Sequence, residues 1–364
     1  MKYMSEYRDP ELAKKYLEEI KKTVSQPWSI MEVCGGQTHS LVKNGIIDML
    51  PKEVTMIHGP GCPVCVTPLN IIDKAIHLAL EENVILCSFG DMLRVPGSKM
   101  NLLEAKAEGA DIRVLYSPLE AVKIAEDNLE KEVVFFAVGF ETTAPANALS
   151  VIHAHRKKLK NYSILTSHVL VPPAIKAVID DKESKIDGFL AAGHVCTIMG
   201  NAEYHPLSAE YKVPIVITGF EPLDVLQGIL MVLKQLENSK AEVENQYSRI
   251  VKEEGNPEAQ KMIHKVFETK NQIWRGIGEI PQSGYQVRPT YADYDAKRKF
   301  KIDIPEAPEN PDCISGQIMK GLKKPFECSQ FGKKCKPTNP LGAPMVSSEG
   351  ACAAYYHFSG LVEV

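Results

Sequence analysis

The chain has 364 residues, of which 44% are hydrophobic and 24% are charged, and its formal net charge is −4 at pH 7. This length supports two or three domains with real cores, and the composition is that of an ordinary globular protein, which excludes the disordered and fibrous classes. The Lys and Arg residues are interspersed with Asp and Glu, so the sequence lacks the basic footprint of a nucleic-acid-binding protein.

The N-terminal stretch of residues 1–22 is charged throughout and lacks the apolar segment of a signal peptide. Apolar runs further on, such as residues 133–140, have the length of a strand, whereas a membrane helix needs about 18 apolar residues. We therefore expect a cytoplasmic protein with no membrane or nucleic-acid partner. In that reducing compartment, nine cysteines favour metal or redox chemistry over a framework of structural disulfides.

From residue 54 to about residue 233, short β-rich runs alternate with amphipathic helical patterns. The predicted strands span residues 54–59, 83–90, 112–117, 132–140, 162–170, 186–195 and 213–220. The predicted helices between them span residues 69–82, 100–109, 119–131, 145–160 and 172–182. Near-continuous apolar strands separated by amphipathic helices predict an α/β fold whose parallel sheets are covered on both faces.

We expect these strands to form two α/β units with a break near residue 128. The first would span residues 28–127 and the second residues 128–222, and VGFE at 138–141 is echoed by TGFE at 218–221. After residue 221 the pattern changes to charged helices, predicted at 223–237 and 242–268, and then to a cysteine-bearing tail. Residues 1–27 and 223–364 are expected to form a third, mainly helical domain.

The segment HGPGCPVCVTP at 58–68 places Cys62 and Cys65 between a predicted strand and a predicted helix. We expect Thr67 to cap this helix and Pro68 to open it, so that the positive end of the helix dipole lowers the pKa of the thiols. Such a pair is a dithiol–disulfide couple, half of a metal site, or two buried structural cysteines. A zinc site would need a partner pair, and the sequence has no second CxxC and no HxxxH.

Three other cysteines occur singly. Cys34 lies in CGGQTH, where two glycines allow close approach of a ligand and the polar residues 37–39 follow, although a structural free cysteine is the alternative. Cys87 lies in an apolar strand and is predicted to be a core residue. Cys196 is ambiguous, and the nearby His194 at a strand end is either a functional residue or a buried, hydrogen-bonded histidine.

The tail carries four more cysteines within forty residues, separated by gaps of 14, 6 and 16 residues. They are Cys313, Cys328, Cys335 and Cys352. The segment is rich in Gly, Pro and Lys, which indicates that a metal centre organises its fold. Four thiolates suit tetrahedral zinc or a [4Fe–4S] cluster, and the wide, unequal gaps favour the cluster because zinc sites usually use close CxxC pairs.

Several long motifs occur together and in order along the chain. They are CGGQTH at 34–39, GPGCPVC at 59–65, FGDMLRVPG at 89–97, GFETTAP at 139–145 and the C-x14-C-x6-C-x16-C tail. With these motifs the chain closely resembles the HypD family, which acts in the maturation of [NiFe]-hydrogenases. The resemblance spans nearly the whole chain, although Cys196 is not a thiol that the family pattern includes.

The resemblance implies a metallocofactor assembly scaffold with redox activity. A HypC-type small chaperone and a HypE-type cyanide donor would be its partners, and the hydrogenase large subunit would receive an iron carrying two cyanides and one carbon monoxide, Fe(CN)2CO. Cys34 would hold that iron with a cysteine of the HypC-type partner, and Cys62 and Cys65 would be the redox couple. The four tail cysteines would hold the [4Fe–4S] cluster.

His39, His194 and Glu141 are candidates to orient or protonate the departing group during cyanide transfer. The family architecture would be two Rossmann-like parallel-sheet domains and a smaller, mainly helical iron–sulfur domain. Two rival interpretations remain. A stand-alone iron–sulfur disulfide reductase of the ferredoxin–thioredoxin reductase type gives Cys34 no role, and a zinc-stabilised interaction module leaves the CPVC motif unexplained.

Overall fold

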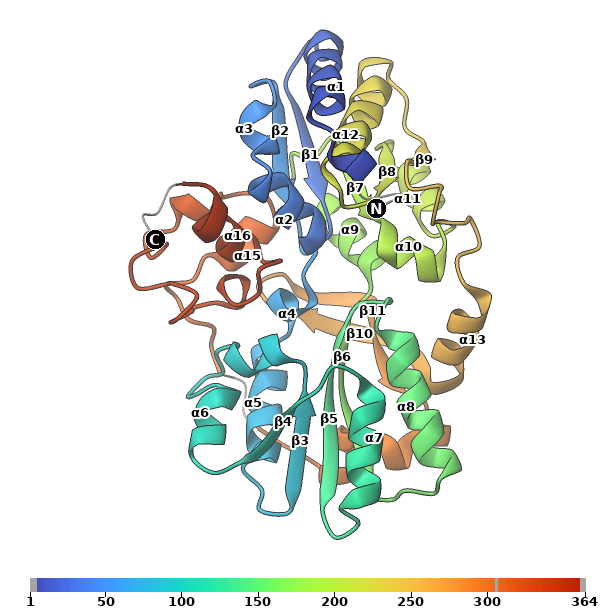
Figure 1. The fold of residues 1–364 in the computed structure, drawn as a ribbon, viewed down its shortest axis with the longest axis vertical. Helices are drawn as coiled ribbons and strands as arrows, with labels where there is room; N and C mark the ends of the chain where they lie inside the picture. The colour runs from blue at the N-terminus through green and yellow to red at the C-terminus, as the bar shows by residue number, and fades with distance from the viewer. Residues whose placement is uncertain (1–4, 305–306, 361–364) are drawn as a thin grey trace.

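The computed structural model describes residues 5–304 and 307–360. It is an α/β protein with two parallel sheets and an antiparallel hairpin, which confirms the predicted fold class (Figure 1). The first sheet has the order β2-β1-β7-β8-β9 and the second has the order β4-β3-β5-β6. Each strand predicted between residues 54 and 220 is present. The sheets lie end to end along the molecule, with the hairpin between them (Figure 1).

The strands of the first sheet are β1 (Trp28–Glu32), β2 (Val54–His58), β7 (Gly188–Ala192), β8 (Ile215–Thr218) and β9 (Val243–Asn245). The strands of the second sheet are β3 (Val84–Ser88), β4 (Asp111–Val114), β5 (Glu132–Gly139) and β6 (Tyr162–His168). The hairpin is formed by β10 (Phe267–Trp274) and β11 (Gly278–Val287). Strands β5, β6 and β7 are buried along nearly their whole length, which explains why their sequences are apolar without alternation.

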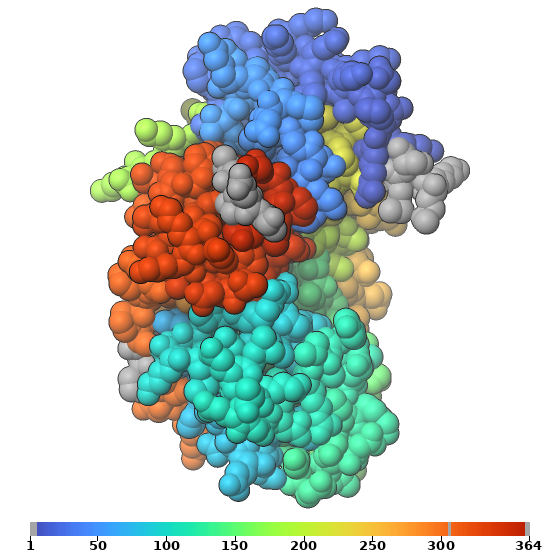
Figure 2. Space-filling view, turned by 60° about the vertical axis from the view of Figure 1, so that its left-hand side comes forward, coloured from blue at the N-terminus to red at the C-terminus, as the bar shows by residue number. Residues whose placement is uncertain are grey.

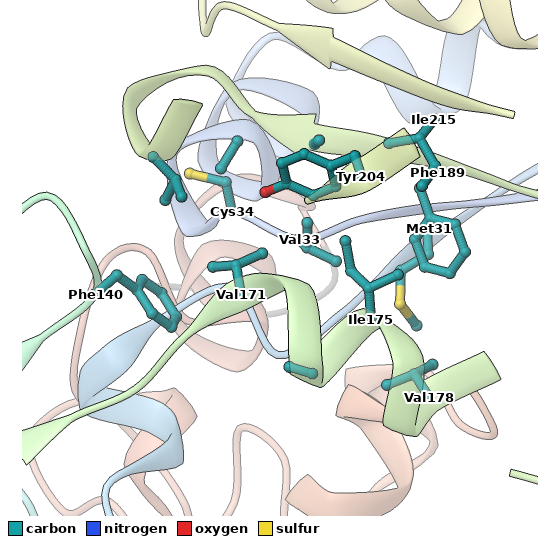
Figure 3. Close-up of a cluster of buried hydrophobic side chains, with 14 of the residues drawn as sticks. Met31, Val33, Cys34, Phe140, Val171, Ile175, Val178, Phe189, Tyr204 and Ile215 are labelled. Carbon is teal, nitrogen blue, oxygen red and sulfur yellow. The ribbon is translucent and has the colours of Figure 1, made fainter. Parts of the chain in front are cut away.

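Helices cover both faces of each sheet. On the first sheet, one face packs against α1 (Pro10–Thr23) and α12 (Pro222–Glu237), and the other against α9 (Val171–Ile179), α10 (Gly193–Met199) and α11 (Tyr204–Tyr211). On the second sheet, α5 (Leu69–Ala79) and α6 (Leu102–Ala107) cover one face, and α7 (Pro118–Asp127), α8 (Ala144–Arg156) and α13 (Pro257–Val266) cover the other. Figure 3 shows part of the core between β1, β7 and α9.

The division of strands between the sheets corrects the expected break at residue 128. Strand β3 pairs with β5, with Val84 opposite Glu132, so residues on both sides of 128 belong to one sheet. The first sheet instead joins β1 to β7, with Ile30 opposite Gly188. Because an apolar strand pattern gives the presence of a strand but not its partner, a chain that leaves one sheet and later returns cannot be recognised from periodicity alone.

The expected helical domain formed by both chain ends also needs correction. Helices α1 and α12 lie side by side on the first sheet, where Lys234 Nζ is 2.6 Å from Glu19 Oε1, away from the tail (Figure 1). The helix predicted at 242–268 is instead β9, a turn region and the shorter α13. The hairpin that follows buries Phe267, Trp274 and Tyr285, and sequence analysis did not predict it.

The tail from Cys313 onward is built of short helices and turns. Its elements are α15 (Ser315–Met319), the 3-10 turns η4 (Pro325–Glu327) and η5 (Ala343–Met345), and α16 (Ala351–Phe358). The tail fills the side of the molecule between the two sheets, as the orange and red surface in Figure 2. Within the described residues, no helix is long and apolar enough to cross a membrane.

Candidate functional site

Two loops that carry cysteines meet at the carboxyl ends of β1 and β2. These strands are parallel neighbours, with Glu32 opposite His58, so the segments that follow them emerge side by side. The Gly35 N–H donates to the Gly61 carbonyl at 2.8 Å. A Cβ added to Gly61 would lie 2.2 Å from the backbone nitrogen of Cys34, so only glycine allows this approach. The structure therefore brings together the two thiol-bearing motifs.

Cys62 and Cys65 are joined by a disulfide, with their Cα atoms 5.2 Å apart. Both are buried. They bracket the first turn of α4 (Pro63–Val66), where the Cys62 sulfur accepts the Cys65 N–H at 3.3 Å. A backbone N–H directed at a sulfur stabilises its thiolate form after reduction.

The expected helix cap at Thr67 differs in the structure. Cys62 itself occupies the N-cap position, and Thr67 ends the short α4 with its hydroxyl donating to the Pro63 carbonyl at 2.8 Å. Helix α5 begins after this turn at Leu69, with Pro68 as its N-cap residue. Helix α4 is an additional turn that was not predicted. It forms because the fixed φ of Pro63 starts a helix earlier in the chain than Pro68 does.

Cys34 is the N-cap residue of α2 (Gly35–Lys43) and is 3% exposed. Its sulfur lies 3.6 Å from His194 Nδ1, at the start of α10. Burial raises the pKa of the Cys34 thiol, and the nearby carboxylates of Glu349 and Glu32 raise it further. Burial also lowers the pKa of His194 to about 4, so its neutral ring can accept a hydrogen bond from the thiol at neutral pH.

A buried carboxylate, Glu32, supports this loop and was not singled out in the sequence. It is 0% exposed, accepts the Cys34 N–H at 2.9 Å and also accepts the Thr38 hydroxyl. Its Oε1 is 2.8 Å from His58 Nδ1 on the neighbouring strand. The signal in the sequence was the charged Glu32 inside the mostly apolar run WSIMEV. Because no strand was predicted at 28–32, this signal did not identify Glu32 as a supporting residue.

The other predicted site residues lie elsewhere. His39 points to the tail, with Nδ1 3.2 Å from the Ser348 carbonyl and its ring edge-on to Phe358. Glu141 follows β5 and accepts the Val171 N–H at 2.8 Å through one oxygen, while its other oxygen has no hydrogen-bond partner among the described residues. Burial raises the pKa of Glu141 to about 8, so this carboxyl is mostly protonated at neutral pH.

The two remaining single cysteines are fully buried. Cys87 lies within β3, in the core of the second sheet, as expected of a core residue. Cys196 lies in α10, two residues beyond His194. Burial raises the pKa of each thiol to about 12, which keeps both sulfurs protonated and unreactive.

All four tail cysteines line a single pocket. Apolar side chains of Ile314, Ile318, Phe331 and Met345 complete its wall. The Leu341 N–H is directed at the Cys335 sulfur at 3.4 Å. A Cβ added to Gly342 would lie 2.3 Å from the Cys313 sulfur, so a larger residue there would displace that side chain. Among residues 5–304 and 307–360, no three His, Cys, Asp or Glu side chains converge closely enough to hold a single metal ion.

The tail also contacts the Cys34 loop. A Cβ added to Gly35 would lie 2.5 Å from the Glu349 Cβ, so the two segments pack tightly. A surface pocket runs from this contact along Val64, next to the disulfide, to Asp91 and Thr143 at the strand ends of the second sheet. The tail cysteines, the Cys62–Cys65 disulfide and the Cys34 loop therefore occupy one region between the sheets.

Comparison with known proteins agrees with these features. The chain matches the HypD family, described as the hydrogenase formation hypA family, over residues 11–359. It is 47% identical to hydrogenase maturation factor HypD2 of Bradyrhizobium diazoefficiens over 368 residues, which cover 98% of this chain and 97% of that protein. It is 46% identical to hydrogenase maturation factor HypD of Azotobacter vinelandii (98% and 97% covered) and 41% identical to that of Escherichia coli K12 (98% of each). The chain therefore belongs to the HypD family.

Proposed function

We propose that this protein acts in hydrogenase maturation as the scaffold and redox protein on which the Fe(CN)2CO group is assembled. In this proposal Cys34 holds the iron together with a cysteine of a HypC-type partner. The Cys62–Cys65 pair supplies electrons for cyanide transfer. The observation that carries the proposal is the contact between the Cys34 loop and the disulfide loop, joined by the Gly35–Gly61 hydrogen bond.

The surroundings of Cys34 suit an iron-binding thiol. A soft thiolate anchors iron while leaving positions open for cyanide and carbon monoxide. Because burial raises its pKa, the free Cys34 is a neutral thiol, and binding of the iron substrate deprotonates it. Gly36 leaves space beside the sulfur, since a Cβ there would lie 3.7 Å from Cys34 Sγ and 3.1 Å from the Phe220 ring. The neutral His194 ring, 3.6 Å away, orients the sulfur.

The dithiol provides the two electrons that release cyanide from a carrier thiocyanate. The Cys62 thiolate attacks the carrier sulfur, the sulfur–carbon bond breaks, and cyanide leaves with the bonding pair for the iron. The Cys65 thiolate then attacks the mixed disulfide, which frees the carrier thiolate and re-forms the Cys62–Cys65 disulfide. The pocket lined by Val64, Asp91 and Thr143 opens beside this pair and offers a path for the carrier segment of a HypE-type donor.

The tail pocket fits a [4Fe–4S] cluster. Cys313, Cys328, Cys335 and Cys352 would hold the cluster, because all four line one space that has an apolar wall. When bound, the cluster would supply electrons that return the disulfide to the dithiol. Reduced thiols of this kind are kept in the cytoplasm, where we place the protein.

The test replaces the proposed iron ligand. Cys34→Ala should keep the fold and the visible absorption of the tail cluster but lose the infrared bands of iron-bound carbon monoxide and cyanide in the complex with a HypC-type partner. Cys87→Ala, which also removes a buried thiol, should retain those bands. If Cys34→Ala complexes carry the bands at wild-type intensity, the iron is held elsewhere and the proposal is wrong. A wild-type complex without bands would favour the reductase interpretation instead.

A further inference from the structure

We infer that Glu32, His58 and Tyr355 are positioning residues that hold the Cys34 loop and make its geometry depend on the folded tail. This inference rests on the proposed role of Cys34 as the iron ligand. The three side chains form a continuous hydrogen-bonded chain from the backbone of Cys34 to the helix that carries Cys352, and all three are buried.

Glu32 is the centre of this chain. One carboxylate oxygen accepts the Cys34 N–H, and the other accepts the Thr38 hydroxyl and faces His58 Nδ1. Cys34 is the N-cap residue of α2, and Thr38 lies in the first turn of this helix. The carboxylate therefore fixes where the helix starts. A buried carboxylate is tolerated only when donors satisfy it, and here three donors do so. The position of the Cys34 backbone, which carries the sulfur, therefore depends on Glu32.

His58 transmits this arrangement to the tail. Because a carboxylate oxygen only accepts hydrogen bonds, His58 Nδ1 carries the hydrogen that faces Glu32 Oε1. The other ring nitrogen, Nε2, lies 3.1 Å from the Tyr355 hydroxyl. The imidazole therefore links the Glu32 carboxylate to the Tyr355 hydroxyl through its two ring nitrogens.

Tyr355 connects the chain to the cluster-binding segment. It lies on α16 one turn after Cys352, packs edge-on against His58 at 5.4 Å between ring centroids, and contacts Val42 of α2. A [4Fe–4S] cluster that binds Cys352 would order this helix, because metal binding is coupled to folding in small metal-organised segments. The Cys34 loop would then be set correctly only once the tail has folded.

The test measures hydrogen exchange and alkylation of the Cys34 loop when no iron is bound at Cys34. Tyr355→Phe keeps the ring and removes the hydroxyl, and Tyr356→Phe, next on the same helix, is the matched control. We expect hydrogen exchange in peptides that cover the Cys34 amide to become about two- to tenfold faster in Tyr355→Phe only, the range given by the loss of one ordinary hydrogen bond. Alkylation of Cys34 should accelerate in parallel, while the iron and sulfide content stays at the wild-type value.

A double-mutant cycle separates coupling from general loosening. In a Glu32→Gln background the chain is already broken, so adding Tyr355→Phe should leave exchange at Cys34 unchanged. If Glu32→Gln does not fold, His58→Gln takes its place in the cycle. Unchanged exchange in Tyr355→Phe, or fully additive effects, would overturn the inference. These exchange and alkylation rates are measured with no iron bound at Cys34, so they test only this inference. A wild-type complex without the infrared bands would contradict the proposed function.

Discussion

Replacing Gly61 by Ala should push the two thiol-bearing loops apart. The added Cβ would lie 2.2 Å from the Cys34 nitrogen, 2.4 Å from the Val33 carbonyl carbon and 2.5 Å from the Cys34 Cα. These are backbone atoms that cannot rotate away, so the loops must separate by about 1 Å. Overpacking of this kind costs about 1–3 kcal/mol, and loss of the Gly35–Gly61 hydrogen bond adds about 1 kcal/mol. We expect the free energy of unfolding to fall by about 2–4 kcal/mol.

Urea unfolding followed by tryptophan fluorescence measures this loss, because Trp28 begins β1 and Trp274 is buried at the end of β10. Gly90→Ala is the control, since its Cβ would meet only the Val114 side chain, at an ordinary 3.6 Å. Alkylation of Cys34 should also become faster in Gly61→Ala. A Gly61→Ala midpoint equal to that of Gly90→Ala would show that the loops do not meet as described.

Three further predictions test the tail, a buried acid and a buried ion pair. Cys335→Ala should abolish or strongly reduce the broad visible absorption of the anaerobic protein, and Cys87→Ala should not; four irons retained in Cys335→Ala would contradict the cluster assignment. Burial raises the pKa of Glu141 from 4.5 to about 8, so the folded state favours the protonated form. The contribution of Glu141 to the free energy of unfolding is complete below pH 4.5 and is lost as the pH rises to about 8. Over that range, the urea midpoint of the wild type should fall relative to that of Glu141→Gln. Arg249→Leu leaves the fully buried Asp224 carboxylate without its bidentate partner and should lower the free energy of unfolding by about 3–5 kcal/mol; a change below about 1 kcal/mol would show that the pair is dispensable.

Local sequence was enough to single out the two cysteine-bearing loops that the structure brings together. The glycines around Cys34 and Cys62 have no purpose in an ordinary strand or helix, and in the structure Gly61 is the point at which the two loops touch. The supporting residues could not be found in this way. His58 is the last residue of β2, and Tyr355 lies almost 300 positions later, so nothing local indicates that their side chains are 3.1 Å apart.

The sequence by itself determined the α/β class, the strands between residues 54 and 220, and the groups of cysteines, because periodicity, turn residues and thiol spacing are local properties of the chain. Only the tertiary structure decided how the strands divide between two sheets and how Glu32, His58 and Tyr355 connect. Strand pairing is fixed by the packing of whole layers, in which β1 meets both β2 and the distant β7. A buried polar side chain then finds its partners wherever that packing places a donor or an acceptor.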